Sequence, residues 1–176
     1  VETRIEAVER IAASHLDSAE IWAALGELRV EAGLDHEAIS AFERSVRHDS
    51  TLHGSWHWIG ILKKRQSRDL PGAAQAFERA MAEGGPKAVG LNELAVTRAM
   101  MGEMPRALEH WEEAIAEDPD WGVLYANAIK AALQLGQRDK AAELFSRSLE
   151  AERFEPIAVL SYTDYLVDAG RGREAL

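Results

Sequence analysis

Cysteine is absent from the 176 residues of this chain. That absence excludes disulfides, thiolate metal sites and a cysteine nucleophile. The sequence also lacks a run of the roughly 20 apolar residues that a membrane-spanning helix needs, and it contains no recognisable signal peptide. We therefore expect no membrane span in these residues. The compartment stays open on these grounds, with the cytoplasm slightly favoured over the periplasm.

Basic residues are scarce relative to acidic ones. The chain has 20 Lys and Arg against 30 Asp and Glu, which gives a formal net charge of −10. Because a phosphate backbone is bound by clustered Lys and Arg, nucleic acid is not expected as a partner. Hydrophobic residues make up 47% of the chain. A disordered chain is poor in such residues, so a folded domain with a sizeable core is expected.

Alanine recurs at an almost constant interval along the chain. Five alanines are separated by 35, 34, 34 and 34 residues, and an aromatic residue follows four of them at an offset of four. Such a period indicates an array of one structural unit, and arrays more often bind partners than catalyse reactions. The alanines are Ala38, Ala73, Ala107, Ala141 and Ala175, and the aromatics are Phe42, Phe77, Trp111 and Phe145.

Each repeat is predicted to be a pair of helices. Upstream of each alanine, a large residue, an aliphatic one and a small one follow at helical spacing, as in Trp22, Leu25 and Gly26. Glycines that suit left-handed helix ends come seven residues after the small position, at Gly33, Gly102, Gly136 and Gly170. The second helix then begins, with Asp35 predicted as an N-cap and with Pro71 and Pro105 in first turns.

The repeated pattern resembles that of the tetratricopeptide-repeat family over about nine-tenths of the chain. The resemblance implies an all-α, right-handed α-solenoid of stacked antiparallel helix hairpins. Four full units are expected at 19–52, 53–87, 88–121 and 122–155. Residues 1–18 are interpreted as a degenerate repeat helix or a cap, with an apolar face of Ile5, Val8, Ile11 and Ala12. Residues 156–176 are interpreted as a truncated fifth unit, so the chain is expected to be a piece of a longer protein, with bacterial origin suggested by its richness in Arg and Ala.

Two local departures from the family pattern stand out. One extra residue falls between Trp56 and Ala73, and the polar run 66–69 is its expected place, because an insertion in a surface turn costs little. The tyrosine that the family usually carries in the first helix is replaced by a basic residue in three units. These basic residues are Arg29, Lys63 and Arg98.

The resemblance implies a protein-interaction scaffold that binds a peptide segment in a concave groove lined by first helices. An apolar stretch with flanking charges is expected to mark the site. The groove residues carried over in this way are His57, Ile61, Lys64, Arg65, Asn92, Val96, Met100, Asn127, Lys130 and Leu133. The partner is expected to be a protein or peptide of unknown identity, and Trp58, which lies off the repeat pattern, is a further candidate anchor if exposed.

Other interpretations remain open. The chain could be an accessory domain of a larger enzyme or of a secretion or assembly machine, or it could form homo-oligomers through its solenoid ends. His53 and His57 are four residues apart, a spacing that can ligate a metal, but a solvated helix face is the preferred interpretation. We expect no catalytic residue, no metal and no cofactor, and no enzymatic activity in this chain.

Overall fold

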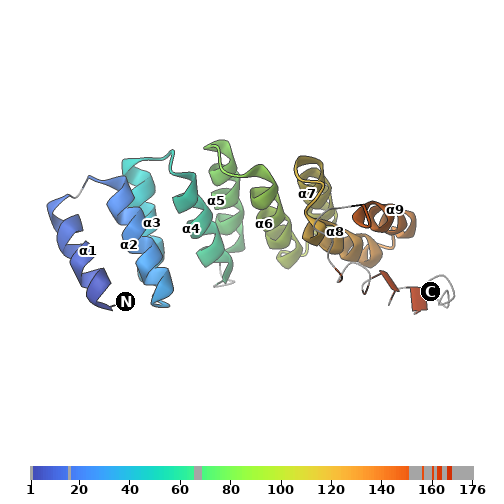
Figure 1. Cartoon of the computed structure of the whole chain (residues 1–176), viewed down its shortest axis with the longest axis horizontal. Helices are drawn as coiled ribbons and strands as arrows, with labels where there is room; N and C mark the ends of the chain where they lie inside the picture. The colour runs from blue at the N-terminus through green and yellow to red at the C-terminus, as the bar shows by residue number, and fades with distance from the viewer. Residues whose placement is uncertain are drawn as a thin grey trace. The chain divides into compact units, whose positions relative to one another are not determined.

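The computed structural model describes residues 2–15, 17–65, 69–150, 156, 160, 162–163 and 166–167. Within this described part the chain forms nine helices and no strand (Figure 1), so the predicted all-α class is confirmed. No described helix is both long and apolar enough to span a membrane. The helices are α1 (Glu2–Ser14), α2 (Ala19–Glu31), α3 (Asp35–His48), α4 (His53–Arg65), α5 (Leu70–Ala82), α6 (Lys87–Met100), α7 (Met104–Glu117), α8 (Gly122–Gln134) and α9 (Arg138–Ser148).

The chain divides into two compact units, residues 1–86 with α1–α5 and residues 87–176 with α6–α9. Inside each unit, helices that follow one another in the sequence pack side by side (Figure 1). The expected insertion lies at 66–69, of which 66–68 fall outside the described residues, as do Gly170 and Ala175. In each unit, helices that follow one another run antiparallel and are joined by short turns.

The repeated alanines that the structure describes belong to the buried core. Ala38, Ala73, Ala107 and Ala141 are all 0% exposed. The paired aromatics Phe42, Phe77 and Trp111 are also buried, and Phe145 is half-buried. Burial of one such side chain stabilises the fold by about 1.5–3 kcal/mol. The period seen in the sequence is therefore the period of the core.

Small residues in the first helices make room for these rings. A β-carbon placed on Gly26 would lie 2.7 Å from the ring of Phe42, and one on Gly60 would lie 2.6 Å from the ring of Phe77. These distances are shorter than van der Waals contact, so any larger residue would displace a buried ring. The hairpins α2–α3 and α4–α5 thus depend on glycine for the approach of their two helices.

The predicted helix-ending glycines are confirmed wherever the structure describes them. Gly33, Gly102 and Gly136 have φ angles of 73°, 80° and 71°. These angles lie in the left-handed region, which a residue with a side chain rarely adopts. Each glycine reverses the chain between the two helices of a hairpin.

Helix starts follow the prediction at two prolines but not at Asp35. Pro71 and Pro105 lie in the first turns of α5 and α7. The prediction of Asp35 as an N-cap is wrong, because Asp35 is already helical and Leu34 occupies the cap without a side-chain bond. The carboxylate of Asp35 instead accepts a hydrogen bond from Arg65 at 2.9 Å.

The basic residues at the usual tyrosine position stabilise the turns that follow them. Arg29 Nη1 donates to the carbonyl oxygen of Glu37 at 3.0 Å, which joins α2 to the first turn of α3. Lys63 and Arg98 likewise stabilise the turns that follow them, by pairing with carboxylates. The pairs are Lys63–Asp69 at 3.1 Å and Arg98–Glu103 at 3.1 Å.

Helix α1 packs against α2 along a narrow stripe. Ile5 and Ala12 are buried, and Val8 packs on the same cluster with Leu25. Ile11, which was expected on this face, is 48% exposed. Ile11 lies outside the covered stripe, because α1 packs mainly against α2, with Ala41 of α3 in the same cluster as Ile5.

Candidate peptide-binding surface

The ten predicted groove residues fall in both compact units. Four of them lie on α4 in residues 1–86, and six lie on α6 and α8 in residues 87–176. The two sets are described separately. The α4 set is His57, Ile61, Lys64 and Arg65, and the other set is Asn92, Val96, Met100, Asn127, Lys130 and Leu133.

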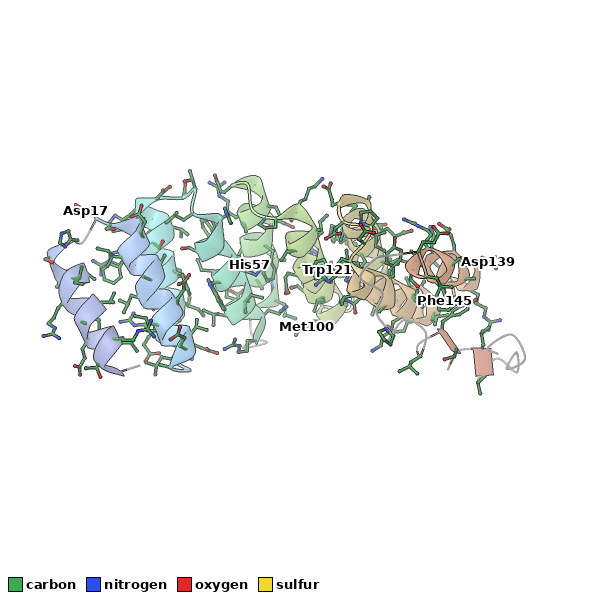
Figure 2. All side chains as sticks on the ribbon, in the orientation of Figure 1. Asp17, His57, Met100, Trp121, Asp139 and Phe145 are labelled. Carbon is green, nitrogen blue, oxygen red and sulfur yellow. The ribbon has the colours of Figure 1, made fainter. Side chains whose placement is uncertain are left out.

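On α4, two of the predicted residues cover the ring of Phe77. The ring of His57 (Figure 2) meets it edge-on with centroids 5.6 Å apart, and Lys64 Nζ lies 5.7 Å from the same centroid. Arg65 is held by Asp35, and Ile61 is half-buried. This set therefore reinforces the α4–α5 hairpin and presents few unengaged groups.

The first unit has a hollow between α2 and the start of α4. It has a volume of about 250 Å³ and two carboxylates, Glu20 and Glu27, on its border. The ring of Phe42 and the hydroxyl-bearing Ser55 also line it. These two carboxylates make the border of the hollow acidic.

In the second unit, α6, α7 and α8 enclose a hollow of about 330 Å³. Four of the predicted residues converge on it, and Met100 at the end of α6 is 47% exposed (Figure 2). Leu133 is half-buried and is not part of the lining. The lining residues are Val96, Ala99, Met100, Met104, Trp111, Asn127, Lys130, Ala131 and Gln134.

Hydrogen bonds to Asn92 connect two lining residues of this hollow, Trp111 and Asn127. Trp111 Nε1 donates to Asn92 Oδ1 at 3.0 Å, and Asn127 Nδ2 donates to the same oxygen at 3.3 Å. Asn92 thus satisfies the indole and orients the Asn127 carboxamide. The Oδ1 atom of Asn127 remains available as an acceptor on the lining of the hollow.

Five of the nine lining residues are not among the ten predicted positions. Two of these five, Met104 and Trp111, lie on α7, whereas the sequence reasoning carried over positions of first helices only. Met104 is the first residue of α7, directly after the turn at Gly102, and it therefore lies near the end of α6. Trp111 was assigned to the core, and it is indeed 6% exposed. As the largest of the repeated aromatics, it fills the core position and still reaches the hollow.

The lining is mostly apolar, with one charge. Methionine, valine and alanine side chains form its walls, and Lys130 is the only charged residue among the lining set. Such a mixture of apolar walls and a few convergent polar groups is typical of ligand-binding sites. Methionine side chains are flexible and adapt to different apolar groups.

Trp58 does not provide an exposed anchor. Its ring is stacked on Phe42 with centroids 6.1 Å apart and an interplanar angle of 9°, and it is half-buried against the core cluster of α3 and α4. Trp58 was a candidate anchor only if exposed, and its stacked, half-buried ring does not meet that condition. The off-pattern position is used to extend the core.

No family model and no curated protein matches this sequence. Among solved structures, a MamA protein is similar with a TM-score of 0.77 and 26% identity over 84% of this chain and 86% of the other. YrrB, described as "a TPR protein with an unusual peptide-binding site", has a TM-score of 0.77 at 14% identity, covering 98% and 88%. PilF of Pseudomonas aeruginosa has a TM-score of 0.76 at 12% identity, covering 99% and 82%.

Proposed function

We propose that this chain, which has the tetratricopeptide-repeat fold, is a protein-interaction scaffold that binds a peptide segment at the α6–α8 hollow. The observation that carries the proposal is the convergence of Val96, Met100, Asn127 and Lys130 on one hollow. YrrB, whose printed description includes a peptide-binding site, supports the same class of function.

The chemistry of the hollow favours a segment with an apolar side chain. Met100 and Met104 would contact that side chain on either side, because they follow each other across the turn at Gly102. Asn127 Oδ1 would accept a backbone N–H of the segment, and Lys130 would favour a carboxylate beside it. The hollow is preformed by the Asn92–Trp111 bond, so little ordering is needed on binding.

A phage-displayed library of random linear peptides, selected on the purified chain, tests the proposal. The selected peptide is labelled, and its affinity for the chain is measured by fluorescence anisotropy. Met100→Glu should weaken it at least about tenfold, because a carboxylate would replace the apolar wall. Met100 is partly exposed, so this change leaves the core intact.

A matched control is available in the same unit. Leu149 is 57% exposed and follows α9, so Leu149→Glu makes the same change of charge away from the hollow. It should bind the peptide as the unchanged chain does. Equal loss of binding in both variants, or full binding by Met100→Glu, would show that the segment does not bind at this hollow.

A further inference from the structure

A second hollow, of about 460 Å³, lies in the first unit between α3 and α5 with α4 as its floor. It is larger than the hollow at α6–α8 and belongs to none of the predicted groove positions. Its floor is apolar, with Ile59 2% and Val46 8% exposed, and Ala76 closes one side. Three cationic residues, Arg47, Lys63 and Arg79, and one carboxylate, Glu43, complete its border.

The antiparallel course of the three helices sorts these charges into two ends. Arg47 near the end of α3, Trp56 near the start of α4 and Arg79 near the end of α5 share one end. Direct contact supports this placement, since Arg79 Cζ lies 6.0 Å from the Trp56 ring. Glu43 lies one turn before Arg47 on α3, and at the other end Lys63, near the end of α4, is paired with Asp69 at 3.1 Å. One end is therefore doubly cationic, and the other is close to neutral.

Comparison with the preceding hairpin explains why the hollow is open. Trp22 occupies the position in α2 that Trp56 occupies in α4, and Arg44 corresponds to Arg79 in the same way. Arg44 Cζ lies 4.0 Å from the Trp22 ring and covers it. Arg79 is also paired with Glu83, with Nη2 2.8 Å from its carboxylate, and lies farther from its ring, with Cζ 6.0 Å from the Trp56 centroid.

Arg47 carries the charge that is available to a ligand. Its side chain is exposed, and within the described residues no carboxylate pairs with it. Two arginines beside the half-buried Trp56 make this end of the hollow cationic in a chain of net charge −10. Arginine binds carboxylates through paired N–H groups, and an apolar floor favours an apolar side chain next to the carboxylate.

We propose that the hollow between α3 and α5 is a second docking site, for a protein segment in which an acidic side chain follows an apolar one. The apolar side chain lies on Val46, Ile59 and Ala76. The carboxylate lies between Arg47 and Arg79, beside Trp56. This site is independent of the α6–α8 hollow and of the function proposed for it.

The test uses two labelled peptides with glycine and serine flanks, one with a Leu-Glu core and one with a Leu-Gln core. The whole chain should bind the first saturably, as measured by fluorescence anisotropy, and the second at least about tenfold more weakly. The indole N–H signal of Trp56 in a ¹H–¹⁵N spectrum, identified with Trp56→Phe, should shift on addition of the first peptide. Equal binding of the two peptides, or an unshifted Trp56 signal, would overturn the proposal.

Charge-reversal variants test whether the peptide binds at this hollow. Arg47→Glu should lose at least about tenfold in affinity, whereas Arg10→Glu, on the exposed surface of α1, should lose none; circular dichroism verifies that both remain helical. Unchanged binding by Arg47→Glu would overturn the proposal.

A competition experiment tests the class of ligand. Free succinate, added at the concentration of the peptide, should not displace the peptide, and displacement equal to that by unlabelled peptide would assign the hollow to small dicarboxylates instead of a protein segment. Met100→Glu should bind the Leu-Glu peptide normally, so the outcome is separate from that of the α6–α8 site.

Discussion

The ring of Phe77 occupies the space into which a β-carbon on Gly60 would project, at 2.6 Å from its nearest ring atom. The two residues belong to the two helices of one hairpin, α4 and α5. Their contact sets how closely these helices approach. It also connects the core to the surface, because His57 and Lys64 lie on the same ring.

Gly60→Ala should therefore destabilise the protein, although alanine favours helix more than glycine does. The added methyl must displace a buried ring, which costs about 1–3 kcal/mol, against a helix-propensity gain of about 1 kcal/mol. Gly54→Ala on the same helix is the matched control, since no atom lies within 4 Å of its β-carbon position. Urea denaturation of both variants measures the difference, and equal stability of the two would contradict the packing argument.

The hydroxyl pair of Ser45 and Ser55 joins α3 to α4 inside the core. Their Oγ atoms are 3.0 Å apart, and both residues are buried. Ser45→Ala should cost about 1–3 kcal/mol, because the hydroxyl of Ser55 loses its partner in a buried place. The double change to alanine should cost less than the sum of the two single changes.

A double-mutant cycle by thermal or urea unfolding measures this coupling. Alanine already occupies the equivalent repeat positions Ala80 and Ala114, so Ser45→Ala should fit without repacking. Strict additivity of the two changes would mean that the hydroxyls do not stabilise one another.

Asp69 links acid stability to the turn between α4 and α5. Its hydrogen bond from Lys63 lowers its pKa below the ordinary 3.8, and the backbone N–H of Gly72 lowers it further. A lowered pKa in the folded state means that the carboxylate stabilises the fold above pH 3.8 and that this contribution is lost as pH falls through the lowered pKa. Wild type and Asp69→Asn should thus differ most at neutral pH and converge in strong acid.

Unfolding free energies across pH test this convergence, and an NMR titration follows the carboxyl directly. Lys63→Met should raise the pKa of Asp69 towards its ordinary value, since the hydrogen bond from Lys63 is the largest cause of the shift. A stability difference that does not change with pH would contradict the assignment.

Arginine over an aromatic ring recurs at equivalent places in three hairpins. Arg44 lies over Trp22, Arg79 over Trp56 and Arg147 over Tyr125. In the α6–α7 hairpin both partners are replaced, by Leu91 and Glu113. The two positions change together, as expected if the arginine is kept for its contact with the ring.

Arg44→Met should lower stability by about 0.5–1 kcal/mol through loss of this cation–π contact. Arg47→Met, one turn further along α3, has no such ring contact among the described residues and should stay within about 0.5 kcal/mol of wild type. Chemical denaturation compares the two. A larger loss at Arg47 would contradict the role given to Arg44.

The repeat predicted the helices and their core well because Ala38 and Phe42 recur in phase with the burial that they experience. It did not predict that Asp35 pairs with Arg65 rather than capping α3, since that choice depends on a residue 30 positions away. For the site, Val96 and Met100 come from the groove positions that the family resemblance implies. Met104 and the hollow at Trp56 were not predicted. Met104 reaches the α6–α8 hollow because the turn at Gly102 brings the start of α7 back to the end of α6, and the hollow at Trp56 depends on the pairing of Arg79 with Glu83.

The central claim is that a peptide segment binds at the α6–α8 hollow, and chemical-shift mapping with the selected peptide tests it most directly. Addition of that peptide to isotope-labelled protein should shift the methyl signals of Val96 and Met100 and the side-chain amide of Asn127 beyond all other signals. Saturable binding that leaves Met100 and Asn127 unshifted would contradict the claim.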